Sequence, residues 1–182
     1  MYRYHLAASF SKDLSTLEFE KLPEISIMKV QIPMKTSTGN FRYGLQTLVN
    51  ELRKIDIYPS ESGFDAIVIG LMVYIADMKI SRKKQSQDSW TREISLFIPV
   101  YDERWKKYKK ILERMLKFLT GDIWKLEFSK RNVEFSEKDK EECRSDKYKI
   151  ASLFSGGMDS LIAAINYMEQ GQPTLLVSHA GE

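Results

Sequence analysis

The sequence predicts an α/β protein, in which a mixed α+β N-terminal domain is followed by the first βαβ unit of a doubly wound parallel sheet. Two observations lead to this prediction. Short apolar stretches typical of strands alternate with longer stretches whose apolar residues recur every three or four positions, as in helices. Near the end of the 182-residue chain, a buried-strand pattern runs through a glycine turn into a helix and then into a second strand.

Composition sets wide bounds on function. Hydrophobic residues make up 43% of the chain and charged residues 29%, which is enough apolar material for a core. The formal net charge of +3 does not by itself indicate nucleic-acid binding. The single cysteine, Cys143, leaves no intramolecular disulfide and no zinc site built from several cysteines. The N-terminus shows no signal-peptide pattern, and no apolar run approaches the roughly 20 residues of a bilayer span. We therefore expect a cytoplasmic protein that contacts neither a membrane nor, directly, nucleic acid.

Residues 1–128 form one predicted domain, and local patterns define its first elements. Strands are predicted at 2–10 and 25–34, and an amphipathic helix at 43–55. A helix at 64–80 follows a plausible cap in the serines just before it. Because this helix is apolar nearly all round, we expect it to be buried on every side as the central helix of the core.

The segment 90–100 predicts a strand in which Arg92 shares a face with Ile94 and Leu96. A charged side chain on an apolar face needs a partner, because unpaired burial costs several kcal/mol. Asp77 and Asp88 are the candidates. Two interpretations stay open: a structural ion pair at the edge of the domain, and an anion-binding arginine at an interface.

A helix at 102–119 carries Trp105, Leu112 and other apolar residues at steps of three and four. Its lysines lie mostly off this stripe, and we interpret them as a solvated face rather than a nucleic-acid patch. The helix is expected to end at Gly121, before a last strand at 123–128. Residues 129–147 are dense in charge and poor in apolar residues, which predicts a linker to the remaining segment, 148–182.

The remaining segment has the order strand, glycine turn, helix, strand. A buried strand is predicted at 149–154, the turn at 155–157, a helix from Asp159 to about residue 170, and a second strand at 174–178. Two parallel strands joined by a helix form a βαβ unit, whose crossover should be right-handed.

The turn has the chemistry of an anion site. Gly156 and Gly157 allow positive φ and let an anion approach the backbone without interference from a Cβ atom. The helix N-terminus adds unpaired N–H groups and partial positive charge, and the hydroxyls of Ser155 and Ser160 can add donors. The turn has no lysine, so it lacks the GxxxxGK[ST] pattern of nucleotide-hydrolysing P-loops, and its spacing differs from the GxGxxG of dinucleotide folds.

The motif SGGMDS at 155–160, placed after a buried strand, resembles the SGGxDS pyrophosphate loop of the ATP pyrophosphatase (PP-loop) superfamily. The stretch from this loop through the helix is most similar to the 7-cyano-7-deazaguanine synthase (QueC-like) branch. The layout of the chain, including QDSWTREI at 87–94, resembles the QueC-like family of the bacterial Qat anti-phage defence system.

The resemblance implies an adenine-nucleotide α-hydrolase-like fold, the cofactors ATP and Mg²⁺, and an adenylation reaction. In the family, a substrate oxygen, such as the carboxylate of 7-carboxy-7-deazaguanine, attacks the α-phosphate and pyrophosphate leaves. Ammonia or another nucleophile then captures the adenylate. By the same resemblance, the phosphate cradle consists of Ser155, Gly156, Gly157, Asp159 and Ser160. Asp159 is then the candidate catalytic residue that helps to place Mg²⁺, and Val177 and Ser178 frame the adenine, largely through their backbone.

The predicted second segment of the chain is shorter than a complete domain of this family. A PP-loop domain normally has a five-stranded doubly wound sheet, and its zinc-binding cysteines lie further along than the two strands predicted here. Two parallel strands and one helix cannot cover both faces of a parallel sheet. We therefore expect the chain to be a truncated product, a split-gene fragment or an incomplete gene model of such an enzyme, and to be inactive alone or at best a weak binder of phosphate.

Two other functions stay open. The first is a non-catalytic module that binds a protein partner through residues 1–128 and carries a vestigial phosphate loop. The second is another PP-loop branch, such as an amide-forming ligase or a tRNA-thiolating enzyme. Cys143, in a charged segment, is a poor candidate for the cysteine that thiolation needs, and His179 is a minor candidate for contact with a nucleotide.

Overall fold

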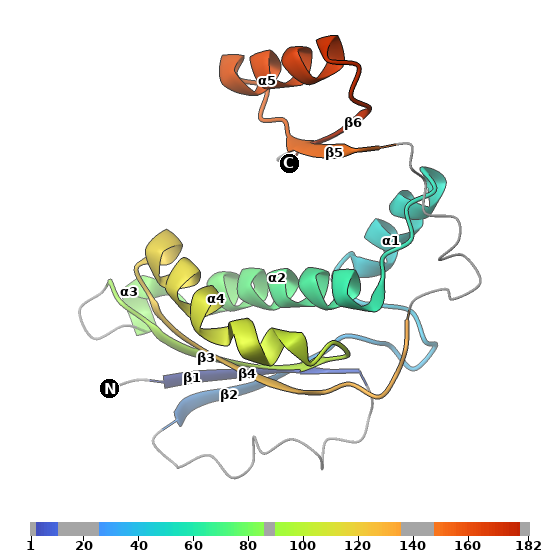
Figure 1. Cartoon of the computed structure of the whole chain (residues 1–182). Coiled ribbons are helices and arrows are strands. Elements are labelled where there is room, and N and C mark those ends of the chain that lie inside the picture. Colours follow the sequence, from blue (N-terminus) through green and yellow to red (C-terminus); the bar gives the residue numbers. More distant parts are fainter. Residues whose placement is uncertain (1–2, 11–25, 86–89, 136–147, 179–182) are drawn as a thin grey trace. The chain divides into compact units, whose positions relative to one another are not determined.

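The computed structural model describes residues 3–10, 26–85, 90–135 and 148–178 (Figure 1). The chain divides into two compact units, Met1–Glu141 and Glu142–Glu182. Each unit contains a parallel sheet and at least one helix, so the predicted α/β class is confirmed.

The first unit is built on a four-stranded sheet with the strand order β2-β1-β3-β4. Its strands, all parallel to their neighbours, are β1 (Arg3–Ser9), β2 (Ser26–Pro33), β3 (Glu93–Val100) and β4 (Ile123–Lys130). β2 pairs on one side of β1, whereas β3 and β4 follow on the other. The direction of chain progression therefore reverses between β1 and β3, as in doubly wound sheets.

Two long helices cover one face of this sheet (Figure 1). α2 (Glu61–Lys79) packs on β3 and β1, and α4 (Arg104–Thr120) packs on β4. The shorter helices are α1 (Leu45–Lys54) and α3 (Arg82–Gln85). The covered face carries Leu6, Leu96 and Leu126 side by side in register, and all three are completely buried. This row of leucines forms the centre of the core.

Local signals place the ends of the long helices. Ser60 Oγ accepts a hydrogen bond of 3.2 Å from the N–H of Gly63 at the start of α2, as an N-cap residue does. Gly121 ends α4 in the left-handed region, with φ of 75°. Both ends agree with the predictions from the sequence.

The expectation that the helix at 64–80 is buried on every side is wrong. Tyr74 and Met78 of α2 are 62% and 69% exposed, because the sheet covers only one side of the helix. In the described part of the chain, none of the helices, α2 included, combines the length and the apolar character that crossing a bilayer requires.

Arg92 lies just before β3 and is held in a buried ion-pair network. Its Nη2 lies 2.6 Å from Oδ1 of Asp77 and 2.6 Å from Oδ2 of Asp122. Burial lowers the pKa of Arg92, but hydrogen bonds and charge from Asp122 and Asp77 outweigh burial and raise the pKa above its usual value. The structural ion pair with Asp77 is confirmed, Asp122 is an additional partner, and Asp88 lies outside the described residues. A guanidinium that is 2% exposed is not placed to bind an external anion.

The first unit extends past the point where the linker was expected to begin. Residues 129 and 130 belong to β4, Arg131 is buried, and Phe135 packs against the core. The expected linker is therefore wrong for residues 129–135, because Arg131 forms ion pairs of 2.8 Å with Asp65 and 2.7 Å with Glu61. The rest of the expected linker, 136–147, lies outside the described residues, and Cys143 with it.

The second unit is the predicted βαβ unit. It consists of β5 (Ile150–Leu153), α5 (Met158–Glu169) and β6 (Thr174–Val177). β5 and β6 pair in parallel from Ile150–Thr174 to Leu153–Val177, so the carboxyl ends of both strands lie at one edge.

Candidate functional site

The glycine loop of the second unit leaves β5 at its carboxyl end and enters α5. The N–H of Phe154 donates a hydrogen bond of 2.8 Å to the carbonyl oxygen of Val177. The end of β6 therefore lies beside the start of the loop. In open parallel sheets, this edge is where ligands bind.

The two glycines of the loop have different conformations. Gly156 has a φ of +79°, in the left-handed region, and a Cβ atom there would meet nothing within 4 Å. Glycine is therefore favoured by the backbone conformation at Gly156, and the space beside this peptide is open to an approaching group. Gly157 is extended, with φ of −83° and ψ of 165°, and acts as the N-cap of α5. Only Gly156 uses the positive φ that the sequence suggested for both.

The serine hydroxyls bond to the loop itself. Ser160 Oγ donates to the carbonyl oxygen of Gly157 at 2.8 Å, and Ser155 Oγ donates to Ser160 Oγ at 3.2 Å. The N–H of Gly157 in turn donates to Ser155 Oγ at 3.4 Å. Both hydroxyl protons are thus used within the loop. The hydroxyls brace the loop, and the first N–H groups of α5, which have no intrahelical acceptor, are the better donors for an anion.

Asp159 lies in the first turn of α5 and is exposed. Its carboxylate is favourable beside the positive end of the helix dipole, but it repels a bound phosphate unless a cation lies between them. Mg²⁺ is commonly held by one or two carboxylates together with substrate phosphates and water. Among the described residues, no group of three or more acidic, histidine or cysteine side chains could hold a metal ion. Asp159 therefore fits as a single protein ligand to a Mg²⁺ carried by a nucleotide.

The structure brings the predicted site residues to one edge of the β5–β6 pair. Val177 is 44% exposed at the end of β6, and Ser178 follows it on the surface. His179 lies outside the described residues. The residues at this edge are Ser155, Gly156, Gly157, Asp159, Ser160, Val177 and Ser178.

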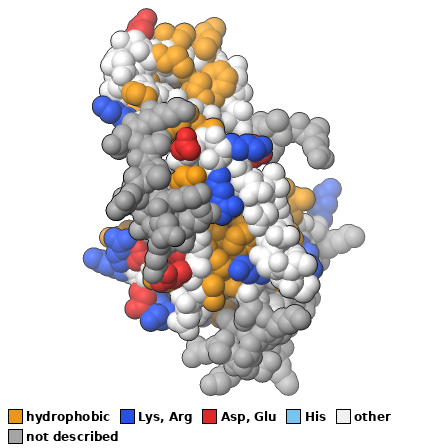
Figure 2. Space-filling model, turned by 90° about the vertical axis from the view of Figure 1, so that its right-hand side faces the viewer, with side chains coloured by type: hydrophobic (Ala, Val, Ile, Leu, Met, Phe, Trp, Pro, Cys, Tyr) orange, Lys and Arg blue, Asp and Glu red, His pale blue; other side chains and the backbone are white. Residues whose placement is uncertain are grey.

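The second unit is open to solvent around the loop. Figure 2 shows hydrophobic side chains on its surface. Leu153, directly before the loop, is 81% exposed, and Met158, directly after it, is 71% exposed. The exposed setting allows a phosphate chain to reach the loop, but it does not exclude water from it. The geometry therefore supports binding of phosphates more directly than it supports catalysis.

In the first unit, the edge at the carboxyl ends of the strands is occupied by side chains of that unit. Asp65 accepts hydrogen bonds of 2.9 Å from the backbone N–H groups of Tyr101 and Asp102, at the carboxyl end of β3. Arg131 forms an ion pair with Asp65, and the ring of Phe135 packs on the guanidinium of Arg131, with 4.6 Å between the guanidinium carbon and the ring centroid. Local sequence patterns do not predict this arrangement, because its members come from three separate segments.

A small cavity lies near this filled edge, in the first unit. Its volume is about 30 Å³, and its lining includes Phe41, Arg53, Tyr58 and Phe64. Ligand sites for nucleotide-sized molecules are roughly ten times larger or more. We therefore assign the candidate nucleotide site to the second unit.

Comparison of the chain with protein-family models, with curated proteins and with solved structures finds no match. The functional argument therefore depends on the loop at 155–160 and on its setting between a parallel strand and a helix.

Proposed function

We propose that the second unit binds the phosphates of ATP through residues 155–160, and that the chain belongs to an adenylating PP-loop enzyme of the QueC-like type. One observation carries the proposal. The motif SGGMDS occupies the turn from a parallel strand into a helix, with Gly156 at φ of +79° and residues 155–159 exposed. This is the setting in which backbone N–H groups hold phosphate oxygens.

Each part of the loop has a role in the proposal. The first N–H groups of α5 donate to the phosphates, the hydroxyls of Ser155 and Ser160 hold the loop in shape, and Asp159 binds the accompanying Mg²⁺. The backbone at Val177 and Ser178 borders the adenine. ATP, when bound, supplies an α-phosphate that a carboxylate such as that of 7-carboxy-7-deazaguanine attacks with loss of pyrophosphate. By the resemblance, this chemistry activates a carboxylate for amide or nitrile formation, in the setting of anti-phage defence. The single cysteine favours the cytoplasm as its compartment.

The exposure of the loop favours a second candidate, a phosphate-binding module without catalysis. Enzymes that form adenylates normally exclude water from the reacting phosphate. Residues 155–159 are exposed, so this chain's own described residues do not provide that exclusion. In the second candidate, the loop holds a nucleotide while the first unit engages a protein partner.

Calorimetric titration of the 182-residue chain with pyrophosphate, Mg·ATP and AMP tests the proposal. We expect pyrophosphate and Mg·ATP to bind and AMP to bind at least tenfold more weakly, because AMP lacks the β- and γ-phosphates. Gly156→Ala should weaken pyrophosphate binding about tenfold, since a hydrogen bond to a charged group contributes about 1.5–3 kcal/mol. Asn166→Ala, on the same helix but away from the loop, is the matched control and should bind normally.

Two results decide the outcome. Equal binding of pyrophosphate by wild type and Gly156→Ala would contradict the proposal. If binding is confirmed, incubation with Mg·ATP, 7-carboxy-7-deazaguanine and ammonium, the nucleophile that captures the adenylate, separates the two candidates. Release of AMP and pyrophosphate supports the enzyme, and binding without release supports the module.

A further inference from the structure

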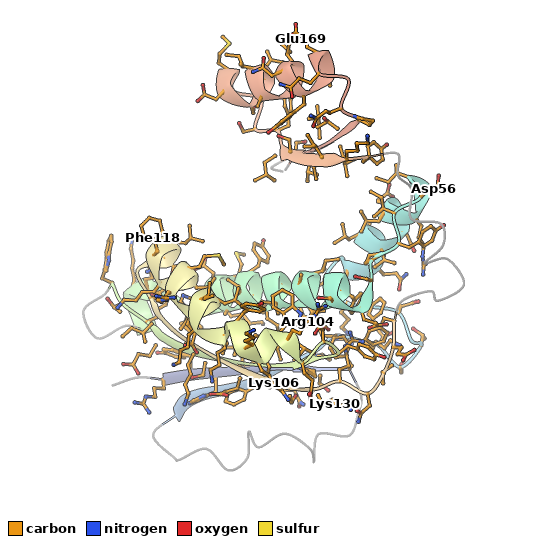
Figure 3. All side chains as sticks on the ribbon, in the orientation of Figure 1. Asp56, Arg104, Lys106, Phe118, Lys130 and Glu169 are labelled. Atoms are coloured by element: carbon orange, nitrogen blue, oxygen red, sulfur yellow. The ribbon has the colours of Figure 1, made fainter. Side chains whose placement is uncertain are left out.

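Helix α4 carries a second apolar surface besides the one in the core. Trp105, Leu112 and Leu116 face the sheet and pack in the core cluster. A separate set of apolar side chains on the same helix is exposed, and we call it the α4 stripe. Its members are Tyr108 (46% exposed), Ile111 (54%), Met115 (47%), Phe118 (89%) and Leu119 (67%). Figure 3 shows Phe118 at the C-terminal end of α4, pointing away from the sheet.

Contacts on the other flank of α4 fix the direction of the stripe. Glu113 accepts a hydrogen bond of 3.0 Å from the N–H of Leu126, and Lys109 pairs with Glu127 at 2.8 Å. Both partners lie on β4, the edge strand of the sheet. Successive helix residues are about 100° apart, so the α4 stripe lies roughly opposite Glu113. The stripe is therefore on the slope of α4 that faces α2.

The facing flank of α2 carries small residues. Arg92 pairs both with Asp77 and with Asp122, which precedes β4, so the flank of α2 that carries Asp77 is the one towards β4 and α4. Ala66 and Gly70 lie on the same flank, because they precede Asp77 by about three and two helical turns. Both are exposed. Small side chains on α2 leave space beside the large apolar side chains of α4.

Basic side chains border the α4 stripe on its outer side. Lys107 and Arg114 lie on the part of α4 that points away from the sheet, whereas Lys110 and Lys117 lie on the flank that carries Glu113. Lys110 pairs with Glu113, but Lys107, Arg114 and Lys117 have no acidic partner in the part of the chain that the structure describes. The stripe is therefore an exposed apolar surface bordered by Lys107 and Arg114, neither of which pairs with an acidic side chain of the described residues.

We propose that the α4 stripe docks an amphipathic helix of a partner protein, whose apolar face covers the stripe and whose border is acidic. The stripe residues recur at steps of three and four from Tyr108 to Leu119, which is the spacing that a partner helix reads. The stripe is about 17 Å long, or three helical turns. Exposed apolar patches rimmed by polar residues typically mark interaction sites, and the positive border selects for acidic residues.

A helix fits this surface better than a bilayer or a nucleic acid does. A planar bilayer would contact Phe118 on the outer side of α4 but would not reach Leu119, which lies nearer the sheet. A nucleic acid would pair with the cations but leave Phe118 and Leu119 in water. A cylindrical helix lying beside α4, over Ala66 and Gly70, contacts the stripe and the cations together.

Binding of designed peptides to the full chain tests the proposal. The probe is a labelled 14-residue helical peptide with leucines on one face and glutamates on the flanks, and its counterpart has lysines in place of the glutamates. Fluorescence anisotropy at low salt should show at least tenfold tighter binding of the glutamate peptide. Phe118→Ser and Ile111→Ser should each weaken that binding about tenfold, and Arg114→Glu should weaken it several-fold. Ile162→Ser, in the second unit, is the control for Ile111→Ser, because the two isoleucines are 49% and 54% exposed, and it should bind normally.

Because Phe118 is 89% exposed, Phe118→Ser should leave the unfolding temperature unchanged, which separates lost binding from lost folding. Equal binding of the two peptides, or normal binding by both serine variants, would overturn the proposal. The proposal would also be overturned if neither peptide binds and the chain instead forms a dimer, binds anionic vesicles or binds duplex DNA, provided that Phe118→Ser abolishes that association. Those results would assign the stripe to a second copy, a membrane or a nucleic acid.

Discussion

Asp122 binds Arg92 beneath the amino ends of β3 and β4, with 2.6 Å between Oδ2 and Nη2 and both side chains almost fully buried. The same carboxylate accepts the backbone N–H of Arg92 at 3.0 Å and pairs with Arg82 at 2.8 Å. Asp122 therefore joins the starts of two neighbouring strands to α3.

Replacing Asp122 should strongly destabilise the first unit. Asp122→Ala leaves the buried guanidinium of Arg92 with Asp77 as its one carboxylate partner among the described residues, and breaking a buried pair typically costs about 3–5 kcal/mol. Urea unfolding monitored by circular dichroism measures this loss. Glu51→Ala removes the exposed Glu51–Lys54 pair and should cost less than about 1 kcal/mol. Similar losses for the two variants would show that the Asp122 network is not a major source of stability.

Arg131 should prove equally important at the opposite end of the sheet. Arg131→Met leaves Asp65 buried without its cation, and we expect a loss of about 3–5 kcal/mol in the free energy of unfolding. Asp65 also accepts two backbone N–H groups, so Asp65→Asn combined with Arg131→Met should recover part of the loss. A double-mutant cycle in urea measures the coupling between them. Additive losses would contradict the ion pair as the source of the effect.

Asp102 gives a prediction about pH. The hydrogen bond from the Arg104 side chain lowers the pKa of Asp102 from 3.8 to about 2. Because the pKa is lower in the folded state, the stabilisation is present above the unfolded value of 3.8 and is lost as pH falls through about 2. NMR titration of the Asp102 carboxyl carbon should give a midpoint near 2, and Arg104→Ala should return the midpoint towards its usual value. An unchanged midpoint in Arg104→Ala would rule out Arg104 as the cause.

Two glycine substitutions should have opposite effects on stability. A Cβ atom at Gly70, in the middle of α2, or at Gly156, in the loop, would meet nothing within 4 Å. Gly70→Ala should stabilise the first unit by about 0.5–1 kcal/mol, because alanine is the better helix former. Gly156→Ala should cost about 1–2 kcal/mol in the second unit, because φ is +79° there. Urea unfolding measures the first effect and amide hydrogen exchange in α5 measures the second. An effect of the same sign at both positions would contradict this account.

Local patterns in the sequence predicted the elements of the fold well. The caps at Ser60 and Gly121, the amphipathic helices and the strand–turn–helix–strand order all depend on neighbouring residues, and the structure contains them. The burial of α2 was the exception. An apolar pattern around the whole helix does not show how many of its sides are covered by other elements.

The relationships between distant segments could not be predicted from these patterns. Arg92 and Asp122 are 30 positions apart, and Arg131 and Asp65 are 66 positions apart. The local sequence around Arg131 predicts a linker, because the burial of this arginine depends on partners in distant segments. The order of the four parallel strands in the first unit follows from such long-range contacts too.

The residues of the candidate site could be predicted from the sequence because most of them are neighbours along the chain. Residues 155–160 lie in one turn, and only Val177 and Ser178 come from the next strand. The sequence could not show that the hydroxyls of Ser155 and Ser160 bond within the loop, or that the loop is open to solvent. Both properties depend on side-chain rotation and on what packs around the loop.

The most direct test of the phosphate loop is an amide NMR titration of the full chain with Mg·ATP. We predict that the largest chemical-shift changes occur at the amides of Gly156, Gly157, Met158, Asp159 and Ser160. The amides at the far end of α5, near Glu169, should change little. Saturating ATP that leaves the loop amides unshifted, or that shifts only amides of the first unit, would contradict the proposed function.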